Sequence, residues 1–183
     1  MMEKQKRTKR DAILAAASTI VRSQGVEKLT LDAAAKEAGV SKGGLLYHFP
    51  NKDALILGMI DHSSEGFWKE MSSRTEKDAS EAGKWTRSYV DTTFNCYEEE
   101  QDMITVLSAA MFTNPEMLKK IQEMYAAVQQ NLQEDGLGPV RSSIIRLAAD
   151  GLWFAEMFGL APPDDELKKQ IFETLMKWTK ENP

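Results

Sequence analysis

The sequence contains few of the residues that most often carry catalysis or bind metals. Its 183 residues include one cysteine, Cys96, and two histidines, His48 and His62. A lone cysteine cannot form an internal disulfide and is typical of a reducing compartment. Glycine-rich phosphate loops, nucleophile elbows and Cys/His ligand spacings are also missing from the sequence. We therefore expect no metal, no cofactor and no enzyme activity.

The sequence also lacks long apolar runs. No stretch approaches the ~20 residues that a membrane-spanning helix needs. The basic start MMEKQKRTKR and the following AILAAASTIV have the order of a signal peptide. However, Ile13, Ala17, Ile20 and Val21 fall on one helical face, and no small-residue cleavage site follows. We predict an amphipathic first helix in a cytoplasmic protein without a membrane partner.

Positive charge is outnumbered by negative charge overall but is concentrated at the N-terminus. The net charge is −5, from 23 Lys and Arg against 28 Asp and Glu. Residues 1–62 carry 10 basic and 7 acidic residues, giving +3, whereas residues 63–183 carry 13 and 21, giving −8. Residues 1–10 form a basic arm. This asymmetry favours a DNA-binding domain at 1–62 and a second domain at 63–183 that does not bind DNA.

The stretch from Thr30 to Leu55 has the pattern of a helix-turn-helix. Thr30 can cap a short helix of strong helix formers, and Gly39 permits the backbone conformation at which that helix ends. Ser41 can then cap a second helix that begins at Lys42. In such a motif the second helix enters the major groove. A scaffold that uses this motif to bind protein is an alternative, but the basic arm speaks against it.

The polar residues in and around this second helix define the expected DNA contacts. Gly43 and Gly44 leave its first turn without side chains, which allows close approach to the duplex. Leu45 and Phe49, four residues apart, should pack inward. The remaining polar groups lie along one short surface, where they can contact phosphates or bases. The predicted DNA-binding set is Thr30, Ser41, Lys42, Gly43, Gly44, Tyr47, His48 and Lys52.

The segments ILAAASTIVRSQGVEKLT and AGVSKGGLLYHFPNKDAL resemble the tetracycline-repressor (TetR) family of bacterial transcriptional regulators. The resemblance implies that Lys42 and Gly44 contact bases or adjoining phosphates. It also implies that Thr30, Tyr47, His48 and Lys52 hold the DNA backbone. The chain departs from the family pattern at Leu46, where an aromatic residue is common, and at Ala34, where a larger aliphatic residue is usual.

The resemblance further implies a homodimeric regulator of double-stranded DNA. Such a protein binds a palindromic operator and, as a repressor, releases it when a small lipophilic effector binds the second domain. A ligand-dependent activator of the same fold is the alternative. RLAADGLWFAEMFGLAPP, near the C-terminus, resembles the C-terminal domain of one branch of the family.

The second domain has helical periodicity throughout. Helices are expected over about 84–100, 102–112, 115–135, 140–160 and 164–180, and no segment alternates like a strand. We therefore predict an all-α protein of about nine helices. It should consist of an N-terminal three-helix domain containing the helix-turn-helix and a larger helical domain for ligand binding and dimerisation.

The helix expected over 140–160 presents two stripes. The small-residue stripe should face another helix, and by family analogy the last two long helices pair across a two-fold axis. The predicted interface consists of Ile144, Ala148, Gly151, Ala155, Phe158, Ile171, Leu175 and Trp178. The second stripe contains Arg146, Asp150, Trp153 and Met157 and could face a cavity. The predicted ligand site consists of Trp85, Tyr89, Tyr125, Asp150, Trp153 and Met157.

Two other interpretations of the second stripe remain open. Arg146 and Asp150 are four residues apart and can form an ion pair within a filled core. A small helical enzyme could instead use Arg146, Asp150 and Glu156. Mutual pairing of the first two is the simpler way to accommodate charges in an apolar helix, so it is favoured over catalysis.

Overall fold

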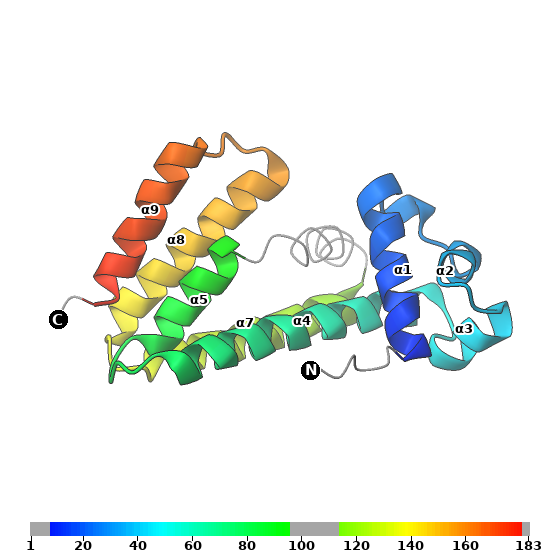
Figure 1. The fold of residues 1–183 in the computed structure, drawn as a ribbon, viewed down its shortest axis with the longest axis horizontal. Coiled ribbons are helices and arrows are strands. Elements are labelled where there is room, and N and C mark those ends of the chain that lie inside the picture. Colours follow the sequence, from blue (N-terminus) through cyan, green and yellow to red (C-terminus); the bar gives the residue numbers. More distant parts are fainter. Residues whose placement is uncertain (1–7, 96–113, 181–183) are drawn as a thin grey trace, which may run out of the picture. The chain divides into compact units, whose positions relative to one another are not determined.

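A computed structural model describes residues 8–95 and 114–180, and in this part of the chain the protein is entirely helical. The described residues contain eight α-helices, one 3-10 helix and no strand, which confirms the predicted all-α class (Figure 1). The elements are α1 (Lys9–Gln24), η1 (Val26–Lys28), α2 (Leu31–Glu37), α3 (Lys42–His48), α4 (Lys52–Lys77), α5 (Lys84–Asn95), α7 (Pro115–Gln133), α8 (Pro139–Phe158) and α9 (Asp165–Trp178). Cys96, the helix expected over 102–112 and the first seven residues of the basic arm lie outside the described residues.

Side-chain caps set several helix starts. The Thr8 hydroxyl accepts a hydrogen bond from the Asp11 N–H at 3.1 Å, and the Asp11 carboxylate accepts one from the Thr8 N–H at 3.0 Å. These bonds lower the pKa of Asp11. The Asp164 carboxylate caps α9 with a single bond, accepting from the Leu167 N–H at 2.8 Å. Each cap satisfies a backbone donor that the helix itself leaves unpaired.

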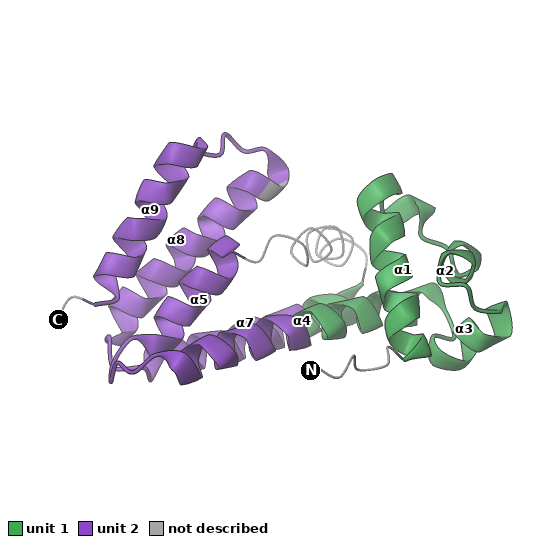
Figure 2. Cartoon of the chain, in the orientation of Figure 1, with its two compact units in different colours: residues 1–64, 98–120 green, residues 65–97, 121–183 purple. Residues whose placement is uncertain are grey.

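The chain divides into two compact units, residues 1–64 with 98–120 and residues 65–97 with 121–183 (Figure 2). In the first unit α1 packs against η1, α2 and α3. Its core consists of apolar side chains with almost no solvent exposure, which include Ile13, Leu14, Ala17, Leu29, Ala34, Leu45 and Leu55. Burial of this size stabilises the unit because each large apolar side chain contributes about 1.5–3 kcal/mol.

The second unit is built on α5, which packs against α8 and α9. Its core contains Met71, Tyr89, Val90, Phe94, Val128, Leu132, Leu137, Ile145, Ala149, Leu152 and Leu175. In this unit Phe94 of α5 lies against Phe172 of α9, with ring centroids 5.2 Å apart. The described helices include none that is long and apolar enough to cross a membrane.

Arg87 ties three segments of the second unit together. Its Nη1 donates to the Thr179 carbonyl at 2.9 Å, and its Nη2 donates to the Ala82 carbonyl at 2.8 Å. Its Nε lies 2.6 Å from the Asp78 carboxylate. That bond holds the pKa of Asp78 well below its usual range. Arg87 therefore joins the end of α9 and the loop before α5 to α5 itself.

Candidate functional site

The helix-turn-helix consists of α2, a four-residue turn that contains Gly39, and α3. The Thr30 hydroxyl accepts from the Ala33 N–H at 3.1 Å, which confirms it as the cap of α2. The Ser41 hydroxyl accepts from the Gly44 N–H at 3.1 Å and caps α3. Gly39 has a φ of +66°, which side chains disfavour. The turn therefore depends on glycine at position 39, and the start of α3 depends on the Ser41 hydroxyl.

The two faces of α3 differ in what they contact. Leu45 and Phe49 are buried in the first unit, as predicted. Lys42, Gly43, Leu46 and Tyr47 are exposed, and Tyr47 is 85% exposed. Because these four positions recur at i, i+1, i+4 and i+5, they form one continuous surface on the helix. A cation, a gap without a side chain, an apolar group and a phenol therefore face outward together.

Lys42 is paired in the free protein. Its ammonium lies 2.9 Å from the carboxylate of Asp32, which is in the first turn of α2. Both side chains are exposed, so this pair contributes little to stability. It nevertheless orients the ammonium. Sequence reasoning missed Asp32 because rules for pairs on a single helix do not reach a partner on the preceding helix.

Lys52 is half-buried. Its Nζ donates to the Val26 carbonyl at 3.1 Å, because η1 brings that carbonyl beside the first turn of α4. An ammonium has three donors, so this bond leaves capacity for a phosphate. His48 is also half-buried, with its ring edge-on to Tyr47 at a centroid distance of 5.1 Å.

The two glycines of α3 occupy different surroundings. A Cβ added at Gly43 would meet no atom within 4 Å apart from the helix backbone and adjacent residues. A Cβ added at Gly44 would lie 3.2 Å from the Ser41 Oγ. The cap therefore gives Gly44 a role in the fold. Packing within the protein gives no such reason for a glycine at position 43.

A polar cluster in the second unit brings together three of the predicted ligand residues. The Tyr89 hydroxyl donates to the Asp150 carboxylate, and Arg146 Nη1 contacts the other Asp150 oxygen at 2.6 Å. Arg146 Nε donates to the Gln129 amide oxygen at 2.6 Å, and its guanidinium lies 5.9 Å from the Tyr125 ring centroid. Gln129 was not predicted, because it is on α7 and its partner is on α8.

Burial dominates the electrostatics of this cluster. It raises the pKa of Asp150, and the bonds from Tyr89 and Arg146 counteract that effect only in part. Burial also raises the pKa of both Tyr89 and Tyr125. The carboxylate is therefore a strong acceptor in a poorly solvated environment, where a cation or a hydrogen-bond donor is favoured.

The other predicted ligand residues have different contacts. Trp85 packs edge-on against Trp68 at 6.3 Å between ring centroids, and Trp153 packs edge-on against Phe154 at 5.1 Å. The side chain of Met157 lies outside the described residues. Glu156 pairs with Lys168 of α9 at 2.6 Å, whereas Asp150 is the partner of Arg146. The geometry thus offers no support for a joint catalytic role of Arg146, Asp150 and Glu156.

Most of the predicted interface residues lie at the surface of α8 and α9. Ile144 is 51% exposed, Phe158 47% and Trp178 41%, and Ala148 and Gly151 are also exposed. Ala155 and Ile171 are half-buried. Leu175 is the exception. It is 3% exposed and packs in the core of its own unit, which places it on the inner face of α9.

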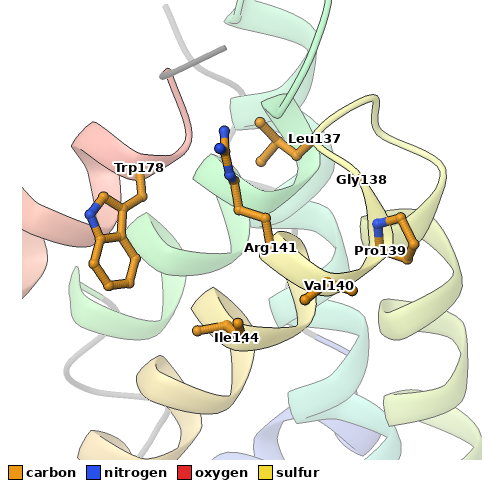
Figure 3. A pocket seen from close by; sticks show the side chains of 7 residues that line it. All are labelled: Leu137, Gly138, Pro139, Val140, Arg141, Ile144 and Trp178. Atoms are coloured by element: carbon orange, nitrogen blue, oxygen red, sulfur yellow. The ribbon is translucent and has the colours of Figure 1, made fainter. Parts of the chain in front are cut away.

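An apolar depression of about 630 Å³ lies where α8 begins. Figure 3 shows its lining, to which α8 contributes residues that include Arg141 and Ile144 and α9 contributes Trp178. The other lining residues are Leu137, Gly138, Pro139 and Val140. None of the predicted ligand residues lines this depression, whereas two of the predicted interface residues do.

Comparisons with known families match most of the chain. Residues 13–59 match the family described as "Bacterial regulatory proteins, tetR family". Residues 83–180 match the family described as "Tetracyclin repressor-like, C-terminal domain". The nucleoid occlusion factor SlmA of Vibrio campbellii is 25% identical over 137 residues, which are 73% of this chain and 69% of SlmA.

Solved structures share the fold at low sequence identity. A TetR-family transcriptional regulator from Rhodococcus sp. has a TM-score of 0.74 and 16% identity, over 94% of this chain and 99% of that one. The multidrug binding protein EbrR, solved with malachite green, has a TM-score of 0.70 and 21% identity. That match covers 96% of this chain and all of EbrR.

Proposed function

The chain belongs to the TetR family of DNA-binding regulators, and from this premise we propose that it is a homodimeric repressor of a palindromic operator. In this proposal residues 1–62 read the DNA and residues 63–183 sense a small lipophilic effector and form the dimer. The protein then acts in the cytoplasm, where the chromosome of a bacterium is accessible.

One observation carries the DNA-reading part of the proposal. The exposed face of α3 presents Lys42, Gly43 and Tyr47 together on a helix whose opposite face is anchored in the core. An exposed, rigidly held helix of this kind fits the major groove. Thr30, Ser41, Gly44, His48 and Lys52 flank this face in the proposed interface. The hydroxyls of Thr30 and Ser41 accept the capping bonds and still have a proton to donate to phosphate.

The test is selection of bound duplexes from a random library with the full chain. We expect two inverted half-sites whose centres are about 10 bp apart or a small multiple of that distance. Affinity should fall steeply with salt, because phosphate contacts release counterions. Lys42→Ala should weaken binding and relax specificity at one position per half-site. Enrichment of non-palindromic or single-stranded targets would contradict the proposal.

The polar cluster around Asp150 supports the sensing part. The carboxylate is buried, accepts from the Tyr89 hydroxyl and is paired with Arg146, whose guanidinium lies over the Tyr125 ring. A buried acceptor among aromatic rings suits a lipophilic ligand with a cationic or hydrogen-bond-donating group. EbrR, which shares this fold, was solved with malachite green and with ethidium. The proposed site consists of Trp85, Tyr89, Tyr125, Asp150, Trp153 and Met157.

Tryptophan fluorescence tests this site, because Trp85 and Trp153 are in it. A panel of lipophilic cations should include a compound that quenches the fluorescence and also lowers operator affinity. Release requires that the compound bind better to the conformation that cannot hold DNA. Asp150→Asn should weaken the quenching while operator affinity without ligand stays unchanged. If the bound compounds leave operator affinity unaltered, the sensing role is wrong.

A further inference from the structure

Leu46 is an apolar residue on the exposed surface of α3, the surface proposed to read DNA. It is 37% exposed, whereas Leu45 and Phe49 fill the core beneath the helix. Its neighbours on the exposed face are Lys42, one turn earlier, and Tyr47. A lysine can contact base acceptors or phosphates, and a tyrosine hydroxyl can donate to phosphate. Leucine can do neither, so its use on this surface must come from an apolar contact.

The major groove offers one apolar group on the bases of unmodified DNA, the C5-methyl of thymine. On the premise of the proposed function, that α3 enters this groove, we propose that Leu46 packs against a thymine methyl in each operator half-site. This contact makes Leu46 a specificity-determining residue that selects thymine over cytosine at one position. The contact with Lys42 then lies about two base steps away, because four residues of helix advance about 6 Å and successive bases about 3.4 Å.

The surroundings of Leu46 allow this contact. Gly43 lies one turn before it, and a Cβ at Gly43 would meet only open space. No side chain therefore projects from the helix at Gly43, beside Leu46. A base edge can come within van der Waals distance of the leucine methyl groups. Tyr47 extends into solvent at the rim of the same surface, where a phosphate contact suits its hydroxyl.

The experiment replaces single thymines of the selected operator with deoxyuridine, which lacks only the methyl group. With the wild-type protein, one thymine per half-site should respond. Its replacement should weaken binding about fourfold in one half-site and about fifteenfold in both, as expected for loss of one buried methyl group per half-site. Leu46→Ala should bind the thymine and deoxyuridine operators equally. Leu46→Met, which keeps an apolar side chain, should retain most of the discrimination.

Three other outcomes are possible, and each contradicts either the thymine contact or the proposed function. If the wild-type protein binds the operator but no deoxyuridine weakens it, the thymine contact is wrong and the DNA-reading function stands. The same holds if deoxyuridine weakens the wild type and Leu46→Ala equally, since another residue then reads the methyl. If no duplex is selected at all, the proposed function fails. Circular dichroism of both variants ensures that a loss of binding is not a loss of helix.

Discussion

The effect of Gly43 on the stability of the fold can be measured separately from its effect on DNA binding. A Cβ at this exposed helical position meets no neighbouring atom. Gly43→Ala should therefore raise the free energy of unfolding by up to about 1 kcal/mol, because alanine is the better helix former. The same methyl group should lower operator affinity by keeping the helix backbone away from the duplex. Urea denaturation and a DNA titration measure the two effects.

Gly44→Ala is the matched variant at the next position. Its Cβ would lie 3.2 Å from the Ser41 Oγ, so the cap of α3 has to shift. The free energy of unfolding of Gly44→Ala should therefore rise less than that of Gly43→Ala, or should fall, since loss of a cap costs about 1 kcal/mol. If Gly43→Ala leaves operator affinity unchanged, close approach of the backbone at this turn is wrong.

At the scale of elements, Asp78 and Arg87 hold the loop before α5 to the end of α9. Both side chains are largely buried, and the Arg87 bond depresses the pKa of Asp78. A depressed pKa in the folded state adds stability above the unfolded pKa of about 4, and this stability is lost as pH falls towards the folded value. Asp78→Asn should cost about 2–3 kcal/mol at pH 7. Its deficit relative to wild type should shrink in urea titrations at pH 3.

Glu81→Gln, at an exposed position of the same loop, is the control for a general charge effect. It should leave the stability within about 0.5 kcal/mol of wild type at both pH values. A deficit of Asp78→Asn that is independent of pH would show that the ion pair is not the source of the effect.

At the scale of the whole molecule, the exposed apolar side chains of α8 and α9 are the proposed dimer surface. Val140, Ile144, Leu147, Phe158 and Trp178 are all at least two-fifths exposed. Ile144→Lys should produce a folded monomer, because a buried charge without a partner opposes association. Light scattering after size exclusion would measure the mass. Operator affinity should also collapse, since a single recognition helix reads only one half-site.

Leu175→Lys provides the contrast within α9. Leu175 lies in the core of its own unit, so this charge should lower the stability of the chain itself. The two variants together separate the outer face of α8 and α9 from the inner face. A dimeric Ile144→Lys protein would place the interface elsewhere.

Within the described residues, the sequence by itself determined the helices and the helix-turn-helix. Thr30 and Ser41 cap the helices they precede, as predicted, and Thr8, Asn51 and Asp164 cap three further helices. Leu45 and Phe49 point inward because their spacing matches the helical period. These features depend on contacts within about four residues, which sequence patterns encode directly.

Only the tertiary structure decided which residues meet across elements. Asp32 holds Lys42, Gln129 holds Arg146, and Arg87 reaches a carbonyl 92 residues away. The periodic apolar residues of α9 do not all face the core. Leu175 is buried, whereas Leu167 and Trp178 remain exposed. Periodicity defines an apolar stripe but not its partner. The partner depends on how helices distant in sequence pack together, and that packing is a property of the whole fold.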